Sequence, residues 1–290
     1  MPCLMFAVFM VFPWKQISYS IMPSAFGVHA DASTYKLLLY KVYAKADMKE
    51  HVQMLMRKSL VYDFSQQEEK LKSSCKATTS GKLTEALRLF LSILHTIPLV
   101  VVESRSEVDE VKELVIIVKE YVLGLKMELK RRETKDDPVR QQELAAYFTH
   151  CNLQLPHLRL ALFSAMGDCY KAKNLATAYN FAKRLLETNP VESQAKTARQ
   201  IVQAAERNMT DATELNYDFG NPFVICGSTY TYVPIYRGQK DVSCPYCTAR
   251  FVPSQEGNIC SVCELAVIGA DASGLVCSPS QVRLSKSGIV

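Results

Sequence analysis

Four cysteines are the only residues of this chain whose type and spacing together specify a chemistry. They form two Cys-x-x-Cys pairs, Cys244 with Cys247 and Cys260 with Cys263, and twelve residues separate the pairs. The short loop of each pair lets both sulfurs point at one ion, and two such pairs supply the four ligands of a tetrahedral zinc site. Because four thiolates leave no open position on the ion, the sequence predicts a structural Zn²⁺ site rather than a catalytic one.

Two other functions for these cysteines stay open. A Cys-x-x-Cys pair can exchange disulfides, although the lack of a βαβ pattern around it weighs against an oxidoreductase. A zinc ribbon can also bind nucleic acid, and Arg237, Lys240 and Arg250 lie in the same region. The net charge of +5 over 290 residues is small for a nucleic-acid-binding protein, so we expect no such partner.

The cysteines lie in a segment, residues 223–283, that is predicted to form a small β-rich domain. Strands are expected at Arg250–Val252 and Glu264–Ile268, one after each cysteine pair, which is the pattern of a zinc ribbon or a rubredoxin-like hairpin. A domain of about 60 residues is too small for a large core. A metal that contributes on the order of 10 kcal/mol would therefore supply much of its folding energy.

Two further cysteines of this domain, Cys226 and Cys277, have no partner at metal-binding spacing. They are either buried apolar side chains or part of an incomplete second site, and burial is favoured. Residues 215–222 are rich in turn-forming types and are predicted to be a linker, and residues 284–290 a tail.

The composition, 48% apolar and 22% charged, is that of a globular chain with room for about two domains. Ten cysteines are too few for a disulfide scaffold, which indicates a reducing compartment such as the cytosol. The apolar run from Leu4 to Phe12 is too short to span a bilayer, and no basic residue precedes it as in a signal peptide. Residues 1–32 stay unassigned and are expected to be poorly ordered.

Residues 33–214 are predicted to form a helical domain. Apolar residues at steps of three and four run from Val108 to Leu129, which predicts one long helix from Ser106 to about Arg132. Asp137 before Pro138 marks another helix start, and no set of side chains in this domain is arranged for catalysis. Further helices are expected over residues 33–62, 65–76, 138–150, 156–173, 175–188 and 190–208, with capping boxes at Ser65, Ser104 and Asn189.

Two segments of this domain resemble each other weakly. Ala86 precedes Pro98 by twelve residues, and Ala178 precedes Pro190 by the same number. In a tetratricopeptide-like hairpin a small residue lets two helices approach closely, and the proline ends the second helix. Two copies this far apart predict helical hairpins of that kind and no regular array; two unrelated helices that end in proline remain the alternative.

The long helix carries more apolar surface than one neighbour can cover. Leu114, Ile117 and Tyr121 form a second apolar line beside the main stripe. Either the chain itself covers this line or a partner protein does, so these three residues are candidate partner contacts. The basic residues at the end of the helix, Lys130, Arg131 and Arg132, could touch an anionic surface, but an exposed helix end is the favoured explanation.

Several blocks of unusual composition occur between about Phe64 and Arg283. They are Glu68-Glu-Lys-Leu-Lys, Ala77-Thr-Thr-Ser-Gly-Lys-Leu-Thr-Glu-Ala-Leu, Ile97-Pro-Leu-Val-Val-Val-Glu-Ser-Arg, Lys119-Glu-Tyr-Val-Leu-Gly-Leu-Lys-Met-Glu, Asp137-Pro-Val-Arg-Gln-Gln-Glu-Leu-Ala-Ala-Tyr-Phe-Thr, Ser193-Gln-Ala-Lys-Thr-Ala-Arg-Gln, Asn216-Tyr-Asp-Phe and Pro234-Ile-Tyr-Arg-Gly. In these blocks the sequence resembles the C-terminal region of the alpha subunit of coatomer, the COPI vesicle coat.

The resemblance implies a cytosolic, non-enzymatic scaffold that binds the epsilon subunit of coatomer, itself a helical-repeat protein. With the other coatomer subunits it would build the coat for Golgi-to-ER retrograde and intra-Golgi transport, peripherally on the Golgi membrane. Complete alpha subunits begin with two β-propellers and a helical solenoid, which residues 1–60 do not resemble. We therefore expect a truncated form, for which cargo recognition is not implied. The metal site is predicted from the cysteine spacing alone.

Overall fold

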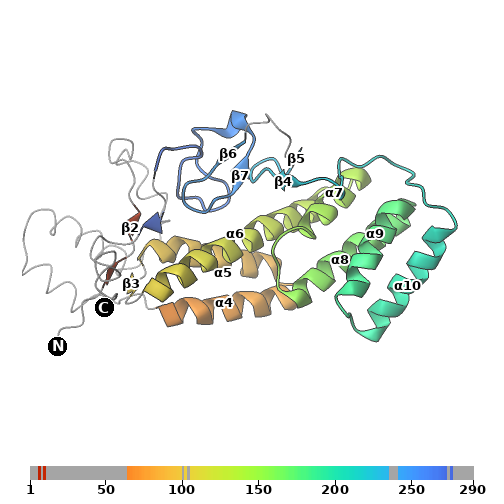
Figure 1. Ribbon diagram of the computed structural model, residues 1–290, viewed down its shortest axis with the longest axis horizontal. Coiled ribbons are helices and arrows are strands. Elements are labelled where there is room, and N and C mark those ends of the chain that lie inside the picture. The colour runs from red at the N-terminus through yellow and green to blue at the C-terminus, as the bar shows by residue number, and fades with distance from the viewer. Residues whose placement is uncertain are drawn as a thin grey trace, which may run out of the picture.

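The computed structural model describes residues 6–7, 9–10, 64–99, 101–102, 105–234, 241–272 and 275–276. The helices of this part are α4 (Phe64–Thr79), α5 (Leu83–Thr96), α6 (Arg105–Glu133), α7 (Pro138–Phe148), α8 (Leu155–Lys171), α9 (Leu175–Glu187) and α10 (Glu192–Glu206). The strands are β1 (Phe6–Ala7), β2 (Phe9–Met10), β3 (Val101–Val102), β4 (Phe223–Ile225), β5 (Tyr232–Pro234), β6 (Val242–Ser243), β7 (Arg250–Phe251) and β8 (Leu275–Val276). The predicted fold class, mainly helical with a small β-rich C-terminal part, is confirmed (Figure 1).

The helices predicted from periodicity are present from residue 64 onward, and the long helix α6 ends within one residue of its predicted limits. The N-cap at Asp137 is confirmed, since its Oδ1 accepts a hydrogen bond from the Arg140 amide at 2.9 Å. The helices predicted over residues 33–62, and the cap at Ser104, lie outside the described residues.

Two predicted capping boxes are wrong. Ser65 already lies within α4. Asn189 does not start α10, which begins at Glu192; it follows the end of α9 in a left-handed conformation with φ of 52°. Asparagine tolerates this conformation well, and Pro190 cannot continue a helix because it has no amide proton, so the pair ends α9 instead of starting α10.

The helices pack around two hydrophobic cores. The first lies between α4, α5 and α6 and includes Phe90, Val118 and Tyr121. The second lies between α7, α8, α9 and α10 and includes Met166 and Phe181. Helix α7 contributes to both, because neighbouring residues on it point to opposite sides. Figure 1 shows the three-helix group of α8, α9 and α10 at one end of the long α6.

Small residues sit where the sequence predicts close helix packing. Ala86 on α5 and Ala178 on α9 have no exposed surface. Helix α5 packs on α4, and α9 packs on α8, as two hairpins joined by short turns. Their likeness to tetratricopeptide repeats remains a prediction.

The β-rich part consists of short two-stranded ladders. Strands β4 and β5 pair antiparallel with Val224 opposite Val233, and β6 pairs with β7 with Val242 opposite Phe251. The strand predicted at Glu264–Ile268 is wrong: this segment is a turn with one isolated bridge between Ile259 and Val267. The cause is local, because Glu264 has a φ of 61°, which no extended strand allows.

Residues 215–222 are not a free linker, because part of the segment is held by the helices on which it lies. The Tyr147 hydroxyl donates to the Asn216 carbonyl at 2.6 Å, and the Asn216 amide donates to Glu143 at 2.9 Å. The Tyr217 ring stacks on Phe181 at a centroid distance of 5.6 Å. The segment therefore joins α7 and α9 on its way to the β-rich part.

Short strands near the N-terminus complete the described structure. Phe6–Ala7 pairs with Val101–Val102, and Phe9–Met10 pairs with Leu275–Val276. None of the helices within the described residues has the length and hydrophobicity needed to cross a membrane.

Candidate metal centre

The four predicted cysteines meet at one point. The sulfurs of Cys244, Cys247, Cys260 and Cys263 all lie within 4.8 Å of one another, and all four residues are buried. The Cys244 and Cys263 sulfurs are 3.7 Å apart, and those of Cys247 and Cys260 are 3.6 Å apart. Two thiolates bound to one zinc ion at about 2.3 Å would lie about 3.8 Å apart at the tetrahedral angle. The cluster could therefore hold a metal ion, and no other such group of ligand side chains occurs among the described residues.

Both pairs lie on the same type of backbone turn, here called a knuckle. In the first knuckle (residues 244–249) the Cys247 amide points at the Cys244 sulfur at 3.4 Å, and the Thr248 amide donates to the Cys244 carbonyl at 3.0 Å. In the second knuckle (residues 260–266) the Cys263 and Glu264 amides repeat these contacts to Cys260 at 3.5 and 2.9 Å. Amide donors on a sulfur favour its thiolate form, which is the form that binds metal.

The residue after each pair has a left-handed backbone. Thr248 and Glu264 both have a φ of 61°. This conformation turns the chain so that both sulfurs of a pair face inward. Glycine adopts it at the lowest cost, so both residues are strained as they stand.

The thiols also bond to one another, which affects their acidity. Hydrogen bonding from the Cys247 thiol lowers the pKa of Cys244, and hydrogen bonding from the Cys244 thiol lowers the pKa of Cys260. The same hydrogen bonds raise the pKa of Cys247 and Cys263, because a thiol that donates to a neighbouring sulfur keeps its proton. None of the described cysteines is in a disulfide.

A third knuckle, at residues 226–231, was not predicted. The Cys226 amide donates to the Thr231 carbonyl, the Tyr230 amide donates to the Cys226 carbonyl, and Tyr230 has a φ of 53°. This is the backbone of the first knuckle with Thr229 in the place of the second cysteine. Cys226 is fully buried, as expected, and the third knuckle supplies no ligand to the cluster. A Cys-x-x-Thr pattern was its only signal in the sequence.

The first and second knuckles lie directly against the helices. Tyr246, between the two cysteines of the first knuckle, donates its hydroxyl to the Leu94 carbonyl in the last turn of α5 at 2.7 Å. Burial raises the pKa of Tyr246 well above its usual range, so the hydroxyl keeps the proton it donates. From α6, Lys126 donates to the Ser261 carbonyl at 2.6 Å and pairs with Glu264 at 2.8 Å. The β-rich part therefore covers one side of α5 and α6 (Figure 1).

The three candidate partner contacts on α6 differ in how far they are exposed. Leu114 and Tyr121 are buried by the chain itself, and the Tyr121 ring stacks on Phe90 at 4.6 Å. Ile117 is half-buried. The apolar side chain that α6 does expose is Ile116, at 45%.

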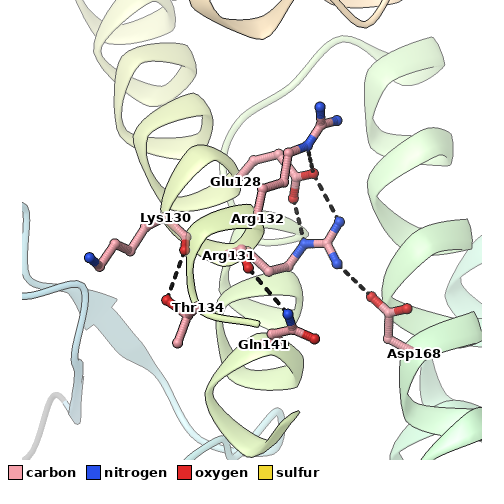
Figure 2. Close-up of polar contacts among 7 residues, drawn as sticks. All are labelled: Glu128, Lys130, Arg131, Arg132, Thr134, Gln141 and Asp168. Atoms are coloured by element: carbon pink, nitrogen blue, oxygen red, sulfur yellow. Dashed lines mark hydrogen bonds and ion pairs between the residues drawn. The ribbon is translucent and has the colours of Figure 1, made fainter. Parts of the chain in front are cut away.

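The basic end of α6 is largely neutralised within the chain (Figure 2). Arg131 donates two hydrogen bonds to Glu128, at 2.7 and 2.9 Å, and a third to Asp168 on α8 at 2.8 Å. Arg132 adds a bond to Glu128 at 3.1 Å. These residues tie α6 to α8, and only Lys130 of the three basic residues points away from this network, so they do not form a surface for anions.

Comparison with known proteins assigns the family. The model for the C-terminus of the COPI coatomer alpha subunit matches residues 7–283. The chain belongs to the coatomer alpha C-terminal family. Over 225 residues it is 86% identical to coatomer subunit alpha-1 of Arabidopsis thaliana. These residues are 78% of this chain and 18% of that protein.

More distant members of the family match over a similar region. Coatomer subunit alpha of Dictyostelium discoideum is 46% identical over 216 residues, 71% of this chain and 18% of that protein. Coatomer subunit alpha of Saccharomyces cerevisiae is 33% identical over 208 residues, 71% of this chain and 17% of that protein. The chain thus spans less than a fifth of the length of the coatomer alpha subunits it matches. The family model extends the resemblance toward the N-terminus, beyond the start at Phe64 expected from the sequence.

Proposed function

We propose that the chain is a non-enzymatic structural part of the COPI coat that binds the epsilon subunit of coatomer. Its membership of the coatomer alpha family is the observation that carries this proposal. The coat would place it in the cytoplasm, peripherally on the Golgi membrane and together with other coatomer subunits, in Golgi-to-ER retrograde and intra-Golgi transport. The buried four-cysteine cluster supports a scaffold, because a closed ligand set has no position for a substrate.

The contact with the epsilon subunit is proposed to lie on the helices. Of the three candidate contacts on α6, Ile117 is partly exposed and can reach a partner. Its neighbour Ile116, which is 45% exposed, can do so as well. An apolar residue of this size gains most from burial at the centre of an interface. Leu114 and Tyr121 would support the interface from inside by keeping α6 in place.

Co-expression with an epsilon-type coatomer subunit tests the proposal. The two proteins should co-purify through gel filtration at physiological salt. Ile116→Lys should weaken the complex because it places a charge in the interface, whereas Lys112→Gln, one turn away on α6, should not. If the wild-type chain and the epsilon subunit elute separately, epsilon binding is excluded for this chain. If Ile116→Lys binds as fully as the wild type, the contact lies elsewhere.

The bound metal is proposed to be a structural Zn²⁺ held by Cys244, Cys247, Cys260 and Cys263. A tetrahedral set of four sulfurs is the donor chemistry that zinc prefers, and the two knuckles orient all four toward one point. When bound, the ion would cross-link the two knuckles. Metal analysis of the purified protein should find zinc in stoichiometric amount.

The alternative function, a zinc ribbon that binds nucleic acid, is not favoured. Arg250 is paired with Asp241. Lys126, beside the second knuckle, donates to the Ser261 carbonyl and pairs with Glu264. Arg237 and Lys240 lie outside the described residues. Among the described residues near the cluster few cations are left for phosphate contacts, so we expect no binding to DNA or RNA even at low salt. Binding that weakens steeply with added salt would favour the alternative.

A further inference from the structure

The three knuckles contact three different helices. Metal ligands occur in the first and second knuckles and not in the third. The first knuckle bonds to α5, and the second bonds to α5 and α6. The third bonds to α7. The attachments of the β-rich part thus divide into a metal-dependent side and a metal-independent side.

On the metal-dependent side, the polar contacts to α5 and α6 come from knuckle residues, beside apolar packing by Phe251 and Ile268. The Leu94 carbonyl, one of the last carbonyls of α5 without a partner in the helix, is satisfied by the Tyr246 hydroxyl. The carbonyl of Cys263, itself a ligand, lies 3.0 Å from His95 Nε2. Lys126 reaches Ser261 and Glu264 on either side of the Cys263 ligand. These atoms hold their positions only while the two knuckles stay closed.

On the other side, the contacts involve no ligand. Arg140 on α7 donates to the Thr229 and Tyr230 carbonyls of the third knuckle, at 3.2 and 2.9 Å. The β4–β5 ladder holds this knuckle by its own hydrogen bonds. Two bonds join it to the metal-binding part, from the Gly227 amide to the Arg250 carbonyl and from the Ser261 hydroxyl to the Gly227 carbonyl, both at 2.9 Å. The Phe223 ring stacks on Tyr232 at 4.7 Å and packs against His150 at 4.8 Å.

We propose that the metal controls the docking of the first and second knuckles on α5 and α6, and that the third knuckle stays anchored on α7 when the metal leaves. The β-rich part is then a hinged cover. Opening it exposes the face of α5 and α6 that carries His95 and Lys126, and helix geometry puts Leu91 and Leu123 one turn away on the same face. The inference rests on the proposed metal site and adds to it a conformational consequence.

Hydroxyl-radical footprinting of the full chain, read by mass spectrometry, tests the cover. Zinc-loaded protein is compared with protein treated with a zinc chelator and with chelated protein to which zinc is restored. Chelation should raise the oxidation of Tyr246, Leu91 and Leu123 several-fold and leave Phe223 and Tyr232 unchanged; restored zinc should reverse the change. Protection of Leu91 and Leu123 that persists without zinc overturns the proposal, and so does equal exposure of Phe223 and Tyr232, because the whole domain then unfolds instead of opening.

Variants separate docking from metal binding. Tyr246→Phe combined with Lys126→Met removes contacts to the helices and leaves all four thiols in place. We expect unchanged zinc content with increased oxidation of Leu91 and Leu123. Lys130→Met, one turn from Lys126 on α6 and 54% exposed, is the matched control and should behave as wild type. A double variant that keeps both zinc and full protection overturns the docking role, whereas a wild-type chain that takes up no zinc refutes the metal site itself.

Discussion

At the scale of single residues, the cysteine cluster shows what spacing alone can and cannot predict. The four ligands follow from two Cys-x-x-Cys pairs and meet as expected. The third knuckle was missed because Thr229 hides the pattern that its backbone shares with the first. The strand expected at Glu264–Ile268 failed because a single left-handed residue, Glu264, turns the chain there. Local conformations of this kind leave little trace in residue type.

The ligand Cys244 tests the contribution of the metal to folding. Cys244→Ser should abolish stoichiometric zinc binding, lower the melting temperature and unfold the first and second knuckles, because a bound metal supplies on the order of 10 kcal/mol in domains of this size. The control Cys226→Ser changes a buried thiol that is no ligand, so zinc content should stay the same. Metal analysis and thermal melting measure both effects. Normal zinc content in Cys244→Ser would show that the ligand set is wrong.

Thr248 tests the strain in the first knuckle. Its φ of 61° is costly for a β-branched residue, and its side chain is exposed. Thr248→Gly should raise the free energy of unfolding of the zinc-loaded protein by about 0.5–1 kcal/mol, after the entropy that glycine adds to the unfolded chain. Thr248→Ala keeps the β-carbon and should give no gain. Denaturant titration of the three proteins distinguishes these outcomes, and a loss of stability in Thr248→Gly would argue against strain.

At the scale of elements, periodicity predicts where the helices lie in the sequence. It does not predict which segments pack around them. The stripe from Val108 to Leu129 predicts α6 almost to the residue, because a helix repeats its apolar face every few residues. What covers the second apolar line depends on segments far away in the sequence. The chain buries Leu114 and Tyr121 itself, and the residues between 241 and 268 close one side of the helix.

The ion network at the end of α6 tests how α6 is held to α8. Arg131→Met should cost about 2 kcal/mol of unfolding free energy, because Glu128, with only 11% of its side chain exposed, then keeps Arg132 as its one remaining partner in the network. Adding Glu128→Leu should recover most of the loss, since the buried carboxylate that has lost a partner is then removed. Lys130→Met on the exposed side should change stability by less than about 0.5 kcal/mol. Equal losses in the single and double variants would show that packing, rather than charge, holds this contact.

A buried histidine joins its own helix, α8, to two others and predicts a pH dependence. Tyr121 on α6 lies 2.7 Å from His157 Nδ1, and Thr79 on α4 lies 2.9 Å from Nε2. The Thr79 hydroxyl donates to the Cys75 carbonyl and the Tyr121 hydroxyl accepts from the Gln154 amide, so the neutral ring satisfies all of these bonds. Burial lowers the pKa of His157.

The unfolded chain therefore binds a proton at His157 more readily than the folded chain. This contribution to stability is complete above the unfolded pKa of about 6.5 and is lost as the pH falls through it. The free energy of unfolding should drop between pH 7 and pH 5, and it should drop less in His157→Gln. Urea titrations across this range measure the slope; identical slopes would mean that His157 is not the group responsible.

At the scale of the whole molecule, the described chain is held together across its predicted domain boundary. The first hydrophobic core includes residues of α5 and α6 together with Phe251, Val262 and Ile268 of the β-rich part. A chain cut after residue 214 should therefore expose apolar surface. We expect it to bind a hydrophobic dye more strongly than the full chain and to melt at a lower temperature. Equal dye binding would show that the two parts fold independently.

The short segment around Tyr217 determines how a force on the β-rich part would be transmitted through the chain. Because Asn216 and Tyr217 are fixed to α7 and α9, a force on the β-rich part cannot be taken up by extension of a flexible linker at these residues. It passes into the middle of the helical array, near the element that both hydrophobic cores share. The chain should resist shear between its two ends, and its first point of yield under load should be the row of contacts at Tyr147 and Phe181.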